Sequence, residues 1–494
     1  MKKLLCLACS SLCFGGGFKL NEHSLNSIAL SSAYVAGANG ADSSLYNPAN
    51  MGRGSFADKH EFEISTTWLY VPKFNFTTDF TRIKKEIGRD QGVQTTCTPK
   101  NFWGNITCAI AQSRLPNIKP GDPQADGYAK TTSFVYPELF YKSPIFYGFN
   151  VGLSITAPSG MTLDWDGEGG KFLDNTFIAM IEANPVLSFK FADWLSIGAG
   201  GRIVYGMGKF QNSLYVPYEA SMDQNIIGGQ ITIESKGTTA VDQTSDTQGV
   251  GYGWNAAVTI KPLAFWTDSL IVSGTYRSPV HIDFKGKLQA KARTGTAQNP
   301  IITTDMDADL TLSTDIPPVF QFGIAQRMGS FLLEFVYERN FWSYGNKFEF
   351  QYKNQRFSNI AGSMKDEVGN TEEERVAYIE NMMSGADYDS VAIGRGWKDT
   401  NSYRLGLTYG VGEKFRAMAS VAFDETPVPK DGFGIPDADG YMVGVGARYS
   451  MFDDLLDVGA AYSMTFKDNR KSPIQSHNGW GKLQLVNISM ACRF

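Results

Sequence analysis

The feature that most constrains this chain is an alternation of apolar and polar residues with period two, which persists from about residue 56 to residue 494. In 456–466 every even-numbered residue is apolar, whereas every odd-numbered residue is small or polar. The segments 195–205, 415–423 and 441–449 follow the pattern closely. Because successive side chains of a strand point to opposite faces, these segments are predicted to be strands with one apolar face.

A soluble β-sandwich also alternates with period two, so the surroundings of the strands need separate evidence. Aromatic residues recur at both segment ends, as at Phe415 and Phe423 or at Tyr441 and Tyr449, which is typical of girdles at two membrane interfaces. The last segment ends on Phe494, like the terminal signal of bacterial outer-membrane barrels. No run of about 18 apolar residues follows the amino terminus, so membrane helices are not expected. These observations favour a membrane barrel over a sandwich.

Short turns alternate with long loops along the chain, as in outer-membrane barrels. The expected architecture is an all-β, 14-stranded antiparallel transmembrane β-barrel formed by residues 56–494. Long external loops are expected at 72–129, 210–247 and 353–396. In the last loop, 363–383 is predicted to contain an amphipathic helix, capped by Thr371 ahead of three glutamates.

Two segments precede the first strand. Residues 1–16 combine two lysines, a short apolar run and glycines, which predicts a secretory signal peptide. Residues 17–55 are rich in Ala, Ser, Asn and Gly, with apolar residues scattered among them, and match neither a strand nor a long helix. Small residues allow tight packing in a confined space, so 17–55 is predicted to plug the lumen as a hatch.

The composition argues against enzymes and nucleic-acid binding. The net charge is −5 and no basic block occurs, so nucleic acid is not an expected partner. The four histidines have no metal or catalytic spacing, and Asp305, Asp307 and Asp309 fit one polar strand face better than a calcium loop. We expect no catalytic residues, no metal and no cofactor.

Cys97 and Cys108 lie in a stretch rich in turn-forming residues. In an oxidising compartment they are candidates for a loop disulfide, with two free thiols as the alternative.

Several motifs stand in order along the chain, namely Gly17-Phe18-Lys19-Leu20-Asn21-Glu22, Asn47-Pro48-Ala49, 193–200, 253–256, 276–286, Trp397-Lys398-Asp399 and 423–429. Together they resemble the outer-membrane long-chain fatty-acid transporters of the FadL type, which include aromatic-hydrocarbon uptake relatives. The resemblance implies a 14-stranded barrel with an N-terminal hatch, and passive uptake of hydrophobic molecules released sideways through a break in strand three. The cysteine-bearing first loop and the helical insertion depart from the family.

Site residues follow from the resemblance. Asn47 and Pro48, with the preceding Leu45 and Tyr46, match the family's tight binding site in the hatch. A plain structural turn is the alternative. In the third strand, Gly148, Asn150 and Gly152 are candidates for the lateral opening, the alternative being glycines that serve twist and packing.

Basic residues provide candidates for a fatty-acid carboxylate. Arg202 and Arg404 point inward by parity, and either bind the carboxylate or pair with lumenal acids such as Asp457. Arg395 and Lys398 better match the position of the headgroup-binding base in the family.

The sequence therefore predicts a monomeric channel of the bacterial outer membrane, surrounded by membrane lipid and lipopolysaccharide. Its predicted partners are hydrophobic small molecules, long-chain fatty acids first and aromatic hydrocarbons as the alternative. A second alternative is a surface adhesin or phage receptor whose long loops act outside the cell.

Overall fold

The computed structural model describes residues 19–494 apart from 55, 83–92, 114–123, 174, 227–228, 265–268, 296–297, 299, 364, 385–389, 395, 413, 430–436, 473–474 and 479–481. The predicted signal peptide and Arg395 lie outside the described residues. Among the helices that are described, none is both long enough and apolar enough to cross a membrane.

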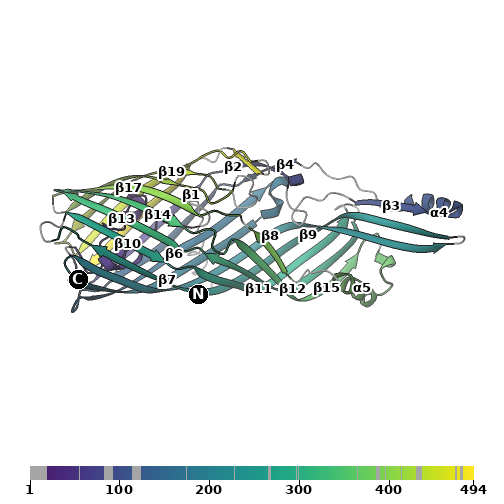
Figure 1. Ribbon diagram of the computed structural model, residues 1–494, viewed down its shortest axis with the longest axis horizontal. Coiled ribbons are helices and arrows are strands. Elements are labelled where there is room, and N and C mark those ends of the chain that lie inside the picture. Colours follow the sequence, from purple (N-terminus) through teal and green to yellow (C-terminus); the bar gives the residue numbers. More distant parts are fainter. Residues whose placement is uncertain are drawn as a thin grey trace.

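The described chain closes into a single antiparallel barrel of 14 strands, as predicted (Figure 1). Strand β22 pairs with β1 from Glu61↔Arg493 to Tyr70↔Gln484, which joins the two ends of the sheet. In order around the wall, the strands are β1 (Glu61–Val71), β5 (Thr132–Lys142), β6 (Phe149–Asp166), β7 (Asn175–Ala192), β8 (Leu195–Ile226), β9 (Gly229–Ile260), β10 (Leu270–Arg277), β13 (Val319–Met328), β14 (Phe331–Asn340), β17 (Thr400–Val411), β18 (Phe415–Asp424), β19 (Gly440–Met451), β20 (Leu456–Lys467) and β22 (Lys482–Arg493).

Large apolar side chains cover the outside of this wall. On β19, Tyr441, Val443 and Val445 are exposed, whereas Met442 is buried on the lumenal side. An exposed apolar belt of this kind is stable only in contact with lipid, which is why the alternation of the sequence identified the membrane-facing residues.

Three wall strands break at one end of the barrel and continue as an extension above it. The breaks lie at Ser278–Pro279, Pro317–Pro318 and 341–346. At the first two, proline lacks the N–H group that a ladder needs. The continuing strands are β11 (Val280–Gly295), β12 (Pro300–Ile316) and β15 (Lys347–Ala361), and the short β16 (Ser390–Gly394) pairs with β15.

Beyond these breaks the inner face of the strands is apolar and the outer face is charged, which is the reverse of the barrel wall. Ile282, Phe284 and Leu312 are buried inside the extension, whereas its outer face carries charges such as the ion pair of Lys287 with Asp309. The polar strand face predicted for Asp305, Asp307 and Asp309 is confirmed, because β12 pairs there with β11 and β15. A charged outer face indicates that the extension stands in water outside the membrane.

The prediction of a polar loop at 210–247 was wrong. Strands β8 and β9 contain 32 residues each and pair from Leu195↔Ile260 to Ile226↔Gly229. About 9–11 residues suffice to cross a bilayer, so the rest forms an arm that projects from the barrel (Figure 1). The buried face of β9 in this stretch carries mostly small or polar residues, such as Thr238, Gln243 and Ser245, so it lacks the apolar face by which the other strands were recognised.

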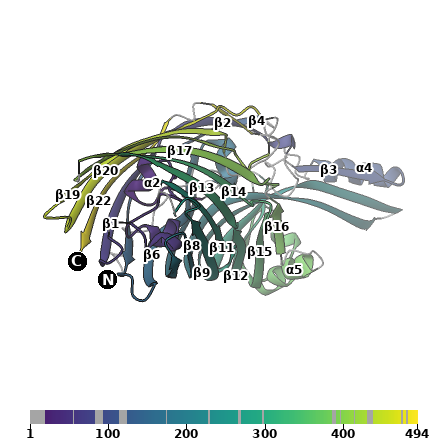
Figure 2. The ribbon, with the colours of Figure 1, turned by 60° about the vertical axis from the view of Figure 1, so that its left-hand side comes forward.

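The predicted first loop, 72–129, also contains regular structure. Its ends form β2 (Phe74–Asp79) and β4 (Gln124–Ala129), which join β21 (Gln475–Asn478) in a small sheet, here called the lid. In both ribbon views β2 and β4 lie together above the barrel wall (Figures 1 and 2). The middle forms β3 (Val93–Pro99) and helix α4 (Phe102–Gln112), and lies on the arm.

The helix predicted within 363–383 is α5 (Glu372–Ser384). The cap is as expected, because the Glu374 N–H donates to Thr371 Oγ1 and the Thr371 N–H donates to Glu374 Oε2, each at 3.2 Å.

Candidate functional site: a plugged lumen beneath an apolar chamber

Residues 19–54, here called the hatch, lie inside the barrel and contact its wall strands. They form α2 (Leu25–Ala29), α3 (Ser43–Tyr46) and η1 (Pro48–Asn50), and nearly all are buried. Figure 2 shows α2 enclosed by the barrel strands. The short turns and the carboxyl end of the chain lie on this side of the barrel, so the hatch occupies the periplasmic half.

Glycines on the inner wall make room for the hatch backbone. A Cβ atom at Gly198 would lie 2.6 Å from the Ala49 nitrogen, and one at Gly444 would lie 2.7 Å from the Ala29 oxygen. Real side chains do not approach so closely. The glycines that alternate with apolar residues in the sequence therefore mark the line where the wall touches the hatch.

Polar contacts tie the hatch to the wall on several sides. The Glu334 carboxylate accepts the N–H groups of Val35, Ala36 and Gly37 at 2.7, 2.6 and 2.9 Å. Arg448 of β19, three strands further around the wall, donates to Asn26 Oδ1 at 2.8 Å. Beneath the hatch, near the periplasmic turns, lies a cavity of about 270 Å³ lined by Tyr34, Glu334, Arg416 and others.

The residues predicted to form a binding site in the hatch are buried where the hatch meets the barrel wall. The Asn47 amide donates to the Val35 carbonyl at 2.8 Å and to Thr259 Oγ1 at 2.9 Å, and its oxygen accepts the Ala49 N–H at 3.1 Å. Tyr46 OH accepts the His23 N–H at 2.8 Å, and Leu45 and Pro48 are buried as well. Asn47 thus fastens η1 to β9. Contact of these four residues with cargo stays a prediction.

The inward arginines pair with lumenal acids, which was the second of the two alternatives. Arg202 lies 2.9 Å from Glu182, and Arg404 lies 2.8 Å from Asp424. Arg448 and Arg416 both pair with Asp457, at 3.0 and 2.7 Å.

Lys398 lies elsewhere, outside the lumenal ion pairs. Its side chain is exposed beside the buried Trp397, and its backbone N–H donates to the Pro427 carbonyl at 3.0 Å. Of the two predicted headgroup-binding residues, only Lys398 is placed by the described chain.

Above the hatch the lumen is lined by apolar side chains. The rings of Trp342 and Trp397 meet edge to face at 5.0 Å, and those of Phe76 and Trp165 lie 4.5 Å apart. We call this region the chamber. Its buried members include Phe74, Phe76, Trp165, Met180, Val204, Ile282, Phe284, Leu312, Trp342 and Trp397. The chamber was not predicted from the sequence, although the change of parity after Pro279 and before Pro318 was a usable signal.

The lid is clasped to β6 by exposed polar contacts. Lys130 Nζ lies 2.9 Å from Asp164, and Tyr128 OH donates to Asp166 at 3.0 Å. The hydrogen bond to Asp164, together with the charge of that carboxylate, raises the pKa of Lys130, whereas partial burial opposes the rise.

The barrel wall is incomplete beside the boundary between hatch and chamber. In this fully described stretch, β5 pairs with β6 only from Leu139↔Ile155 to Lys142↔Gly152. The register between β6 and β7 then shifts between Thr156 and Ser159. Pro158 has no N–H group with which to continue the ladder toward β5.

The residues predicted for the lateral opening lie outside this irregularity, and their role stays a prediction. Gly152 pairs regularly with Lys142 and Val186, and Asn150 pairs with Ser188. Gly148 lies in the preceding turn with φ +86°. The irregularity therefore falls further along the strand, where a proline and not a glycine interrupts the pairing.

The start of the hatch lies along the unpaired part of β6. The Leu20 N–H donates to the Pro158 carbonyl at 3.2 Å, and Lys19 forms a bridge with Ser159. His23 Nδ1 lies 2.6 Å from the Glu138 carboxylate of β5, and both side chains are buried. Hatch residues thus contact both strands at the place where those strands cease to pair.

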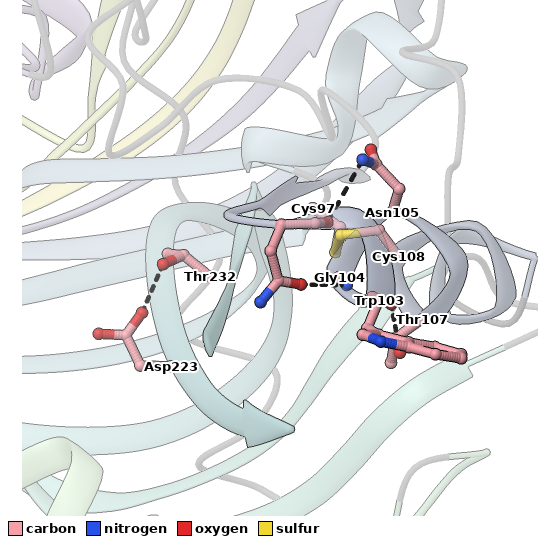
Figure 3. The surroundings of a disulfide bond; sticks show 9 residues. Cys97, Trp103, Gly104, Asn105, Thr107, Cys108, Asp223 and Thr232 are labelled. Carbon is pink, nitrogen blue, oxygen red and sulfur yellow. Dashed lines mark hydrogen bonds between the residues drawn. A yellow bond between two sulfur atoms is a disulfide. The ribbon is translucent and has the colours of Figure 1, made fainter. Parts of the chain in front are cut away.

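The first loop contains the predicted disulfide. Cys97 of β3 and Cys108 of α4 are bonded to each other (Figure 3), which confirms the pairing.

A closed outer-membrane barrel with a plug below and an apolar chamber above defines a channel for hydrophobic compounds. The chain belongs to the family of outer membrane protein transport proteins (OMPP1/FadL/TodX), whose model matches residues 6–490. It is 24% identical over 375 residues to outer membrane protein P1 of Haemophilus influenzae, covering 72% of each chain. It is 23% identical over 365 residues to the long-chain fatty acid transport protein of Escherichia coli K12, covering 69% of this chain and 72% of that protein.

Solved structures have the same fold. A FadL homologue of Pseudomonas aeruginosa superposes with a TM-score of 0.66 at 19% identity, covering 96% of this chain and 99% of that one. The toluene transporter TodX of Pseudomonas putida gives a TM-score of 0.60 at 14% identity, with the same coverage. The protein is thus a transporter of hydrophobic compounds in the bacterial outer membrane.

Proposed function

We propose that this chain is a passive uptake channel for long-chain fatty acids, which collect in the chamber and leave sideways between β5 and β6. The observation that carries the proposal is the position of the incomplete pairing, beside the boundary of a polar plug and an apolar chamber. An apolar molecule gains free energy when its surface leaves water, so the chamber attracts it without an energy source.

The hatch is a poor path for apolar cargo. It is fixed by buried ionic and hydrogen-bonded groups, including Glu334, Arg404 and Arg448, and separating such groups is costly. The membrane lies on the other side of the β5–β6 gap. Opening that gap requires the start of the hatch to leave Pro158 and the His23–Glu138 contact to open. Breaking those few contacts costs less free energy than displacing the hatch, so the sideways route has the smaller barrier.

Two observations bear on the class of cargo. Related proteins carry the name long-chain fatty acid transport protein, and Lys398 lies exposed beside Trp397 of the chamber, where an ammonium group suits a carboxylate. The many aromatic rings of the chamber favour a second candidate, aromatic hydrocarbons. Replacing Lys398 separates the two, because toluene has no charge for it to bind.

The exit is tested by deleting Ala157, which removes the extra residue at the register shift of β6. We expect oleate uptake by cells to fall at least about tenfold while the barrel still folds. The matched control is Ala157→Gly, which keeps the length of the strand. Wild-type uptake by a folded deletion variant would rule out exit at this gap.

The cargo is tested by Lys398→Ala, with Lys236→Ala on the arm as the control. We expect the KM for oleate to rise several-fold, about 1–2 kcal/mol in binding, and toluene uptake to stay unchanged. Equal effects on both compounds would contradict carboxylate binding by Lys398.

A further inference from the structure

The far part of the arm holds a helix in a fixed position. Strand β3 pairs with β9 from Val93↔Gly237 to Pro99↔Ile231, and the Cys97–Cys108 disulfide joins β3 to α4 (Figure 3). The Asn101 side chain caps the helix by accepting the Gly104 N–H at 2.7 Å. Pairing, disulfide and cap together restrain one short helix far from the barrel.

Helix α4 buries its small residues and exposes its bulky apolar ones, which is the reverse of an ordinary amphipathic helix. Gly104 and Cys108 are buried toward β9, next to Ile231 and Ile233. The bulky apolar residues point away, with exposed fractions of 71% for Phe102, 58% for Trp103, 42% for Ile106 and 53% for Ile110. A helix that only had to cover the arm would bury its large side chains and expose polar ones. We call the four exposed residues the apolar face.

The apolar face also lacks charge. The eleven residues of α4, 102–112, include no Asp, Glu, Lys or Arg. Nor does the face reach the protein's own membrane, since the arm extends on the order of 50 Å beyond it at about 3.3 Å per residue. Among the residues that the structure describes, none covers the face.

We propose that the apolar face docks on neutral lipid surfaces outside the cell, such as a zwitterionic membrane or micelle. An uncharged helix with Trp, Phe and Ile on one side matches the boundary between headgroups and acyl chains, and has no preference for charged lipid. This inference goes beyond the proposed function, because it concerns the source of the cargo and not its path. Fatty acids partition into lipid, so a docked arm brings the channel to its supply.

The test uses the full chain in nanodiscs, mixed with phosphatidylcholine vesicles and separated by flotation. We expect the wild type to float with the vesicles. The variant W103S/I106S/I110S should bind at least about tenfold more weakly, because three apolar side chains no longer enter the interface. The control is Tyr378→Ser, which removes a 47%-exposed aromatic ring from α5 and should change nothing.

Other occupants give other results, and each would overturn the proposal. Binding only to vesicles that contain phosphatidylglycerol would show recognition of charge. Association of nanodiscs with one another in the absence of vesicles, lost in the triple variant, would show that a second copy covers the face. Failure of the wild type to float, or flotation equal to that of the triple variant, would show that lipid is not the occupant.

Two further measurements keep the outcome interpretable. An intact Cys97–Cys108 bond in the triple variant, checked by mass after thiol labelling, shows that the arm has folded, and Ile110→Ser alone provides a milder variant. Oleate supplied on albumin should enter cells equally well through the wild type and the triple variant. If the wild type did not take up oleate from albumin, the proposed function would be wrong. The flotation experiment would still show whether the apolar face docks on lipid.

Discussion

The two halves of the lumen differ in their buried charged groups, although Leu25 and Ile28 of the hatch belong to the same apolar cluster as the chamber residues. The periplasmic half contains the hatch, held by buried charged groups such as Glu334, Arg404 and Arg448. The extracellular half is lined by the apolar chamber. A polar network has few alternative arrangements of similar energy, whereas apolar side chains accept any ligand that removes their surface from water. The lower half is therefore suited to remain closed and the upper half to receive cargo.

The sharpest test of this contrast is Arg448→Met. Arg448 is buried and contacts Glu63, Asp457 and the hatch residue Asn26, so its loss leaves two carboxylates without their main counter-charge. We expect the free energy of unfolding to fall by about 3–5 kcal/mol, measured by urea titration of the refolded barrel.

Arg416 provides the matched control, because it also pairs with Asp457 but its side chain is 33% exposed. Arg416→Met should cost clearly less than Arg448→Met. Equal losses would mean that burial of the network does not determine the strength of the plug.

Close packing between hatch and wall gives the next largest effect. A Cβ atom at Gly198 would collide with the backbone at Ala49, whereas one at Gly201 on the same strand meets nothing within 4 Å. Gly198→Ala should destabilise the protein by about 1–3 kcal/mol and speed amide hydrogen exchange in η1. Gly201→Ala should leave exchange in the hatch unchanged, and similar effects of the two substitutions would contradict the close fit.

The sequence predicted the polar half better than the apolar half. Alternation identified the strands, and inward arginines such as Arg202 and Arg404 indicated a charged lumen, although their partners depend on which strands adjoin. The chamber was missed in part because Ile282, Phe284 and Leu312 lie between Pro279 and Pro318, where the inner face of the strands becomes apolar. The arm was missed because the buried face of β9 there carries mostly small or polar residues.

The break in the wall shows a different limit. A glycine in a strand suggests an irregularity, so Gly148 and Gly152 were reasonable candidates. The actual site depends on pairing partners, since Pro158 matters only because β5 ends its ladder beside it. Which edge a proline faces is a property of the closed sheet, and no local pattern specifies it.

The boundary between the halves is tested by His23→Ala. This change removes the partner of a buried carboxylate, Glu138, and weakens the contact of the hatch with β5. Local opening should become easier by about 1–2 kcal/mol, seen as roughly tenfold faster hydrogen exchange of the Leu20 amide. His60→Ala is the control, because His60 contacts Tyr141 near the periplasmic turns and not the gap. Unchanged exchange at Leu20 would show that His23 does not hold the gap closed.

The smallest effect is expected at the lid, which a polar contact joins to β6. Lys130 and Asp164 are both substantially exposed, so salt and water screen their attraction. Lys130→Met should speed hydrogen exchange in β4 slightly at low salt, and at high salt the wild type should behave like the variant. The raised pKa of Lys130 means that the contact is complete at neutral pH and is lost only as the pH rises through that pKa. A lid that loosened between pH 6 and 8 would therefore be held by some other group, and the contrast between a firmly bonded plug and a lightly clasped chamber would need another explanation.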